Sequence, residues 1–397
     1  MMAACMSAKG GAEVLLLEKN NILGKKLLIT GKGRCNITNF CGEDEFIANM
    51  PENGRFLYSA INFFTAKDTI SFFEQAGVMT KTERGKRVFP ISDKSQDVVN
   101  ALHRVMMSKN CHIRTGVAVK KLIIQNSKCV GCFASSGEIF KADKIIVCCG
   151  GKSYPQTGSS GDGYNLALQG GHTVTPLSPS LVPLVSCDTC CKSLQGLSLK
   201  NISLKVFDTK TKKEPYNDFG ELIFTHFGIS GPLVLSASAH MSHMADGRYI
   251  VVIDLKPALT DGQLSKRLLR DLSKNINKSI ANSLKELLPK RIIPIILTRA
   301  DIDFNKQCNS ITKEDRAKLI NNIKNFNIEI KGFRPIEEAI VTSGGVSVNE
   351  INPKTMESKI TKQLFFAGEV IDVSGYTGGF NLQAAWSTGA LAGKVCT

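Results

Sequence analysis

The chain has 397 residues, of which 43 % are hydrophobic, and its formal net charge is +15. This length and composition suffice for one large domain with an insert and argue against a disordered chain. No apolar run approaches the roughly 18 to 20 residues that span a bilayer, and the first residues lack the order of a signal peptide, so we expect a soluble cytoplasmic protein that does not bind membranes.

The thirteen cysteines of a chain without an export signal are expected to be reduced thiols rather than a disulfide framework. Cys187 and Cys190 have the spacing of a redox motif, but they lie in a polar linker where the sequence shows no following helix start that would lower a thiol pKa. His240 and His243 supply only two ligands for zinc. We therefore expect neither a dithiol centre nor a metal site.

The N-terminal part alternates helices with strands, which is typical of an α/β domain. A buried parallel strand over 12–18 closes on Glu18, and an apolar strand over 144–149 ends at Gly150 and Gly151. The other elements predicted here are the end of a helix at 1–9, helices at 66–76 and 95–109, a hairpin at 84–90, and strands around 117–124 and 131–133.

From about residue 186 the hydrophobic period changes to two, which predicts an antiparallel sheet or barrel. The strands expected there are 199–206, parts of 221–227, 248–255 and 339–348. Two groups of apolar residues within this region keep helical spacing and predict a helical subdomain: Leu264, Leu268, Leu269 and Leu272, then Ile280, Leu284, Leu287 and Leu288.

A C-terminal strand and helix return the chain to its first domain, so that domain is predicted to be discontinuous. We assign it residues 1–187 and 340–397. The β-barrel insert is predicted at 188–258 and 328–339, and a helical lid at 259–327.

The C-terminal strand at 364–369 leads through the glycines of 375–381 into a helix at 382–392. Backbone amides at a helix N-terminus are unpaired, and the macrodipole adds roughly half a positive charge. Phosphate, or the electron-rich edge of a reduced flavin, would be stabilised there. The alternative is a glycine-rich turn that only packs the last helix on a sheet, and this segment alone does not decide between them.

Three further features suit a dinucleotide. Glu18, at the tip of a strand, could accept hydrogen bonds from the ribose hydroxyls of adenosine. The segment 24–39 combines glycines with cations and small polar donors suited to a diphosphate. The segment 150–163 is a second glycine loop directly after a strand, although a single loop of this kind is weak evidence.

The segments 18–39, 150–164, 224–232, 342–346 and 367–381 together resemble the BaiN-like bacterial flavoprotein family of NAD(P)/FAD-dependent oxidoreductases, which includes a bile-acid reductase. The resemblance covers essentially the whole chain. It implies an α/β fold class, with a discontinuous three-layer FAD domain of the glutathione-reductase type, an inserted β-barrel and a helical lid.

The resemblance also implies which residues surround FAD. They are Glu18, Lys19, Lys26, Thr30, Arg34, Cys35, Asn36, Val119, Gly150, Gly151, Glu369, Asp372, Gly379, Phe380, Asn381 and Leu382. No catalytic acid is assigned. Tyr154, His226 and Tyr376 lie in matching segments, but an aromatic or histidine beside a cofactor is more often a packing element than a proton donor.

One feature of the family is missing from the printed sequence. The family begins with a strand and a Gly-x-Gly-x-x-Gly turn that contacts the pyrophosphate, and no such motif occurs in these 397 residues. We therefore expect the gene to encode about 10 to 20 further residues upstream, and the printed chain alone to bind FAD poorly.

The expected function is that of an FAD-dependent oxidoreductase, a reductase that takes hydride from transiently bound NADH or NADPH and reduces a polarised C=C bond. By resemblance, a 3-oxo bile acid or similar steroid acid is one substrate option. A flavin-dependent tRNA-modifying enzyme and a flavin-binding protein without turnover are the alternatives. Residues 256–299 hold ten basic and three acidic residues but no Phe, Tyr or Trp. This absence of stacking aromatics favours a small anionic substrate over nucleic acid.

Overall fold

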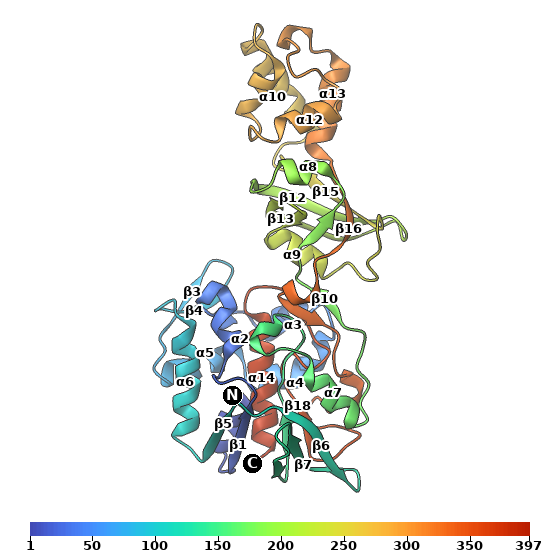
Figure 1. Cartoon of the computed structure of the whole chain (residues 1–397). Coiled ribbons are helices and arrows are strands. Elements are labelled where there is room, and N and C mark those ends of the chain that lie inside the picture. The colour runs from blue at the N-terminus through green and yellow to red at the C-terminus, as the bar shows by residue number, and fades with distance from the viewer. The chain divides into compact units, whose positions relative to one another are not determined.

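The computed structural model describes residues 1–397 and divides them into two compact units (Figure 1). Unit 1 comprises Met1–Ser180 and Pro335–Thr397, and unit 2 comprises Leu181–Arg334. The sequence-based boundaries within unit 2, which separate a barrel from a helical lid, remain a proposal.

Two pairs of parallel strands form the centre of unit 1. β1 (Val14–Glu18) pairs with β5 (Cys111–Thr115), and β9 (Ile145–Val147) pairs with β18 (Leu364–Phe366). β18 is buried at all three positions, as expected for a parallel strand covered on both faces. The second pair joins residues from the two ends of the sequence, so unit 1 is discontinuous in the chain.

Helix α14 (Phe380–Val395) runs through unit 1 and is buried along most of its length. It packs against α1 (Met2–Lys9) and α4 (Tyr58–Phe63) (Figure 1). Glycine permits the close contact with α1, because a Cβ on Gly393 would lie 2.4 Å from the carbonyl oxygen of Ala3.

The remaining elements of unit 1 surround this centre. Its other helices are α2 (Lys25–Ile29), α3 (Glu43–Ala48), α5 (Ala66–Gln75), α6 (Ser95–Met107) and α7 (Asp162–Gln169). Three antiparallel sheets contain β2 (Thr38–Asn39), β4 (Arg87–Pro90) and β3 (Thr80–Glu83); β6 (Val119–Gln125), β7 (Lys128–Ala134) and β8 (Ile139–Lys141); and β10 (Ser178–Ser180) with β17 (Val341–Ser343). A hairpin is present where one was predicted at 84–90, but this range holds only its turn and β4, because the first strand, β3, ends at Glu83. The strand expected within 339–348, for an antiparallel sheet or barrel, is β17, which is antiparallel but pairs with β10 in unit 1 and not with the barrel.

Unit 2 contains a closed six-stranded barrel. In spatial order its strands are β11 (Leu184–Ser186), β14 (Gly228–Ser230), β13 (Lys213–Thr225), β12 (Ser198–Asp208), β15 (Tyr249–Asp254) and β16 (Phe326–Phe333). In β15 the residues Tyr249, Val251 and Ile253 are buried and alternate with partly exposed neighbours. This alternation explains the period of two, since successive side chains point to opposite faces of a strand.

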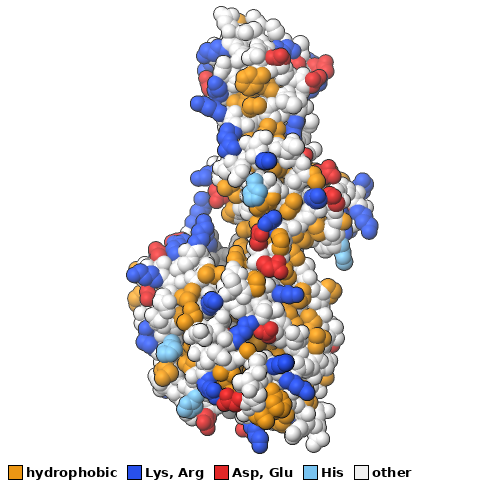
Figure 2. Space-filling view, viewed as in Figure 1, with side chains coloured by type: hydrophobic (Ala, Val, Ile, Leu, Met, Phe, Trp, Pro, Cys, Tyr) orange, Lys and Arg blue, Asp and Glu red, His pale blue; other side chains and the backbone are white.

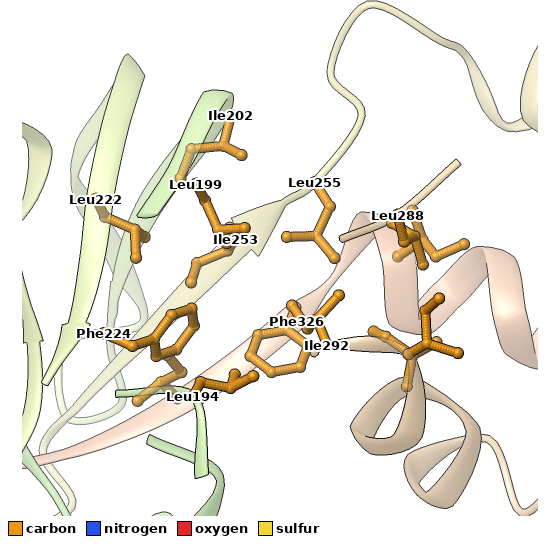
Figure 3. Packing of buried hydrophobic residues seen from close by; sticks show 14 of the residues in the cluster. Leu194, Leu199, Ile202, Leu222, Phe224, Ile253, Leu255, Leu288, Ile292 and Phe326 are labelled. Atoms are coloured by element: carbon orange, nitrogen blue, oxygen red, sulfur yellow. The ribbon is translucent and has the colours of Figure 1, made fainter. Parts of the chain in front are cut away.

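The helices of unit 2 share the core of the barrel. They are α8 (Thr189–Ser193), α9 (Pro232–Ser238), α10 (Asp261–Lys274), α11 (Ile280–Ser283), α12 (Ile293–Arg299) and α13 (Lys313–Lys324). One hydrophobic cluster extends from barrel residues such as Phe224 and Ile253 to Leu288 and Ile292 of the helical part (Figure 3). A continuous apolar core of this kind favours cooperative unfolding of barrel and helices.

Helix α10 begins with a capping box, in which the side chain of Thr260 accepts a hydrogen bond from the amide of Gln263. Leu264, Leu268 and Leu272 are buried on one face, as their spacing predicts. Leu269 was expected in this stripe but is 43 % exposed. The second predicted stripe is not one helix, because α11 passes into a 3-10 turn at Leu284–Glu286.

None of the helices combines the length and apolar character needed to cross a membrane.

Candidate functional site

A glycine loop follows strand β9 and forms the middle of the candidate site. Gly151 lies against two side chains from the C-terminal segment, since a Cβ there would approach Thr342 Oγ1 to 2.6 Å and Glu369 Oε1 to 2.7 Å. The Thr342 hydroxyl oxygen accepts a hydrogen bond from the amide of Lys152 at 2.8 Å. The loop therefore keeps its backbone close to Glu369 only because residue 151 has no side chain.

Lys26 and Glu369 form an ion pair beside this loop, with 2.7 Å between Nζ and Oε2. Lys26 Nζ also donates to Ser153 Oγ at 2.8 Å, and Glu369 Oε1 accepts from the amide of Thr342 at 3.0 Å. The two charged side chains remain about one quarter exposed. Three predicted site residues, Lys26, Gly151 and Glu369, are thus brought together in one polar cluster.

The other end of the glycine loop lies against the end of β1. Glu18 Oε1 accepts hydrogen bonds from the backbone and side-chain nitrogens of Asn20, at 2.8 and 2.7 Å. Asn20 Nδ2 also donates to the carbonyl oxygen of Thr157. Lys19 pairs with Asp162 at 2.6 Å. The strand-end carboxylate is therefore held next to the loop that begins at Gly150, whose own φ is +72°.

Val119 is brought near this strand end by the chain that leaves β5. The amide of Val117 donates to the carbonyl oxygen of Glu18 at 3.0 Å, and β6 begins two residues later at Val119. Val119 therefore lies two residues from a residue that is bonded to Glu18, although about a hundred residues separate Glu18 and Val119 in the sequence.

The segment 30–36 distributes its side chains among different surroundings. Arg34 pairs with Glu83 and Asp93 at 2.9 and 3.2 Å, and its guanidinium lies 4.0 Å from the ring centroid of Phe89. The guanidinium of Arg34 is therefore engaged by side chains of the β3–β4 hairpin and of the residues that follow it. The hydroxyl of Thr30 donates to the carbonyl oxygen of Leu27, so this side chain is also used locally.

Cys35 and Asn36 differ in their polar contacts. The Cys35 side chain is fully buried, and this burial raises the pKa of its thiol to about 12. The side-chain oxygen of Asn36 is buried without any hydrogen-bond partner in the protein. A buried acceptor of this kind requires a donor, which a bound ligand could supply.

The start of α14 depends on Gly379, which has φ +101°. A Cβ there would come within 2.5 Å of the carbonyl oxygen of Thr38. Phe380 packs on Phe46 with 5.7 Å between ring centroids, and Leu382 contacts a second hydrophobic cluster. Asn381 closes the preceding turn, because its side chain bonds both the amide and the carbonyl of Gly375. Helix α14 therefore begins at a tightly fixed turn.

A second acidic site in unit 1 was not predicted in full. Burial raises the pKa of Asp372, and the negative charge of Glu52 adds to this effect, although a hydrogen bond from Thr175 opposes it. Glu52 accepts hydrogen bonds from the hydroxyls of Ser343 and Ser374 at 2.7 and 2.9 Å. Glu52 had no motif around it in the sequence, since its partners lie near the other end of the chain.

Of the remaining sequence candidates, Tyr154 lies within the glycine loop 150–163, and Tyr376 lies in the turn before α14. Tyr154 adopts a left-handed conformation at the start of a 3-10 turn, and the Tyr376 amide bonds to the carbonyl oxygen of Asn49. His226 belongs to unit 2, in the turn between β13 and β14, and its ring packs on Phe227.

Curated relatives match this chain along nearly its full length. It is 33 % identical to the 3-dehydro-bile acid delta(4,6)-reductase of Clostridium scindens, over 100 % of this chain and 96 % of the relative. It is 30 % identical to the ribosomal RNA dihydrouridine synthase of Escherichia coli, over 98 % of this chain and 93 % of the relative.

A solved structure with a similar fold is 3-ketosteroid-delta4-(5alpha)-dehydrogenase from Rhodococcus jostii RHA1, with a TM-score of 0.53 and 12 % identity, over 100 % of this chain and 94 % of that one. The family model described as "HI0933-like protein Rossmann domain" matches residues 1–395. The carboxylate of Glu18 at the end of a strand and the glycine loop beside it are consistent with these full-length matches. The chain belongs to the HI0933-like Rossmann-domain family.

Proposed function

We propose that this protein is an FAD-dependent oxidoreductase that reduces a C=C bond conjugated to a carbonyl group. The observation that carries the proposal is the glycine loop 150–163, which has the Glu18 carboxylate at one end and the Lys26–Glu369 pair at the other. An acidic strand end beside a glycine loop is the arrangement that α/β folds use for dinucleotides.

The residues present fit the ribose and flavin parts of FAD. Glu18 would accept hydrogen bonds from ribose hydroxyls, and Gly150, where a Cβ would meet Ser159 Oγ at 3.5 Å, would let a ligand approach the backbone. Asn36 has a buried side-chain oxygen that needs a donor. The amides at the start of α14 would bind negative charge. We propose these roles for residues that the sequence predicted. Lys19, Val119 and Asp372 are further predicted residues for which we propose contacts with FAD.

Bound FAD supplies the hydride chemistry, and the protein supplies binding, orientation and charge. Lys26 is held by Glu369 and Ser153, so its charge is fixed and largely neutralised rather than free to bind substrate. NADH or NADPH would act transiently as reductant. The names of both curated relatives describe the addition of hydrogen to a ring C=C bond, which supports this reaction class.

A small anionic enone, such as a 3-oxo steroid acid, is our first substrate proposal, and it is supported by the bile-acid reductase relative. RNA is the second candidate, supported by the rRNA dihydrouridine synthase relatives and by the cations of residues 256–299. Some of those cations are neutralised, since Arg267 pairs with Asp271 at 2.6 Å. On the face in view, Lys and Arg of the helical part are mixed with acidic and apolar side chains (Figure 2). This mixture weighs against a large phosphate-binding surface.

The test is to express the gene together with its genomic upstream region, reconstitute the purified product with FAD, remove excess flavin and record the absorbance of bound cofactor. The loaded protein is then incubated without oxygen with NADH or NADPH and either a 3-oxo-4-ene steroid acid or unmodified rRNA. We expect FAD at one per chain and a steroid product heavier by two hydrogen atoms. If only rRNA yields a product, RNA replaces the steroid acid as the substrate. Bound flavin without either product would indicate a flavin-binding protein without this turnover. Absence of bound FAD would refute the proposal.

A further inference from the structure

Three cysteines lie within five residues of unit 2 and differ in exposure. Cys187 is exposed, Cys190 is partly buried and Cys191 is only 1 % exposed. The sequence showed no helix start behind Cys187, but helix α8 begins at Thr189. That expectation was wrong, and Cys190 lies in the first turn of this short helix.

The loop before α8 is fixed to strand β16. The Ser186 hydroxyl donates to the carbonyl oxygen of Glu329 at 2.7 Å, and Asp188 Oδ2 accepts from the amide of Glu329 at 3.0 Å. The amide of Cys191 donates to the carbonyl oxygen of Asp188, which closes the turn. Cys190 therefore lies within an ordered turn, and Cys187 directly precedes this turn between two residues that are fixed to β16.

Arg299, at the end of α12, donates a hydrogen bond to the sulfur of Cys190, with 3.5 Å between Nη2 and Sγ. Its other terminal nitrogen donates to the carbonyl oxygen of Asn327 at 2.7 Å, and its guanidinium lies 4.1 Å from the ring centroid of Phe326. None of these three partners carries a negative charge. The guanidinium is thus fixed beside the thiol with its positive charge still able to stabilise a thiolate.

The surroundings of Cys190 contrast with those of other thiols. A hydrogen bond from the Cys191 thiol, together with the charge of Arg299, lowers the pKa of Cys190 to about 7. Burial instead raises the pKa of Cys35 and of Cys396 to about 12. Cys190 should therefore ionise more readily than these thiols, although burial and the nearby carboxylate of Asp188 oppose this.

We propose that Cys190 is an oxidation site, and that Cys187 resolves the oxidised form as a disulfide. The Cys190 thiolate attacks one oxygen of hydrogen peroxide, the O–O bond breaks, hydroxide leaves and Cys190 becomes a sulfenic acid. The Cys187 thiol then attacks that sulfur, and water leaves as the S–S bond forms. The two sulfurs together lose two electrons, and the peroxide is reduced to water.

Cys187 is a better resolving partner than Cys191. Cys191 adjoins Cys190 in the chain, so a bond between them would have to close across a single peptide unit, and its side chain belongs to the core of unit 2. Cys187 is exposed and lies three residues from Cys190, across the turn. This inference is independent of the flavin reaction proposed above.

The first measurement is the rate of alkylation of Cys190 by iodoacetamide as a function of pH, followed by peptide mass spectrometry of the full chain. We expect a midpoint near pH 7 in the native protein. In Arg299→Gln the midpoint should move upward, while the hydrogen bond from the Cys191 thiol remains, so alkylation at pH 6 should become several-fold slower, and Arg299→Lys should restore part of the rate. Arg291→Gln is the matched control, because Arg291 bonds the Ser193 carbonyl at the other end of α8. A native midpoint near 8.5, or equal shifts in the Arg291 and Arg299 variants, would overturn the proposal.

The second measurement uses equimolar hydrogen peroxide. We expect a Cys187–Cys190 disulfide in the native chain, and in Cys187→Ser a sulfenic acid on Cys190 that dimedone traps. Unfolding temperatures compared for all variants ensure that a lost signal reflects chemistry and not misfolding. Oxidation spread evenly over the exposed cysteines, or a disulfide confined to Cys190 and Cys191, would contradict the assignment.

Discussion

The two units of the molecule are built on different kinds of core. Unit 2 has one continuous apolar cluster, shared by barrel and helices. Unit 1 has two clusters, and α14 contributes Phe380 and Ala384 to one but Trp386 and Ala390 to the other. Between them lie buried polar side chains such as Gln383 and Ser387, which hydrogen-bond to each other at 2.9 Å. Unit 2 is thus held by one apolar cluster, whereas unit 1 combines two apolar clusters with buried polar side chains on the helix between them.

The largest effect should follow from a cavity in unit 2. Phe224→Ala removes a fully buried ring of β13, and we expect a loss of about 3 to 5 kcal/mol in the free energy of unfolding. Barrel and helices should lose hydrogen-exchange protection together, because they share one cluster. Phe219→Ala is the matched control, since that ring lies on the same strand and is 58 % exposed. Loss of protection in the barrel alone would contradict the single core.

A smaller but still large effect is expected in unit 1 from Gly379→Ala. The new Cβ would require left-handed backbone and would collide with the carbonyl of Thr38, so we expect a loss of about 2 to 3 kcal/mol, measured by urea unfolding. Gly33→Ala is the control, because Gly33 also has positive φ but nothing lies near its Cβ position. Similar losses in both variants would mean that backbone strain alone, and not the contact with Thr38, requires glycine.

The next test concerns the site. In the gene product expressed with its genomic upstream region, Glu18→Ala should weaken FAD binding roughly 10- to 150-fold, because a charge-assisted hydrogen bond worth about 1.5 to 3 kcal/mol is lost. Glu18→Gln keeps an acceptor for Asn20 and should lose less, and Glu13→Ala, whose side chain is 78 % exposed, should have no effect. Fluorescence titration of FAD measures all three. Unchanged affinity in Glu18→Ala would remove this carboxylate from the site.

The smallest effect concerns pH. Since burial raises the pKa of Asp372 in the folded protein, its contribution to stability is present at low pH and is lost as the pH rises above the ordinary value of 3.8. Asp372→Asn has no carboxyl group to titrate at this position, so this loss should disappear. As the pH rises from 4 to 7, the unfolding temperature of the variant should therefore increase relative to that of the native protein. This interval lies above the ordinary pKa because the pKa of Asp372 is raised. A constant difference would mean that Asp372 titrates as an ordinary carboxyl.

Local pattern predicted much of this fold. The alternation of 199–206 is confirmed as part of β12, because a barrel strand has an inside and an outside and its sequence records both. Glycines marked turns that only glycine can form, as at Gly379. These features could be predicted because each depends on neighbours in the chain or on a face of one element.

Features that depend on distant partners could not be predicted in this way. The alternation of 339–348 predicted a strand of an antiparallel sheet or barrel, but Gly344 and Gly345 have positive φ and interrupt it, and β10 is its partner. Arg34 lies in a glycine-rich, cationic segment suited to phosphate, yet it pairs with Glu83 of β3 and with Asp93, which follows β4. The contact between Cys190 and Arg299 likewise joins residues more than a hundred positions apart.

The pairing of β9 with β18, and of α1 with α14, bears on the order in which the chain acquires structure. Ribosomes release residues in sequence, and all of unit 2 emerges before residues 335–397. Strand β9 and helix α1 therefore remain without their partners β18 and α14 until the end of synthesis, while unit 2 can fold first. The apolar surfaces of β9 and α1 are exposed during that interval. The incomplete unit 1 is therefore the part of the nascent chain that most needs protection by chaperones.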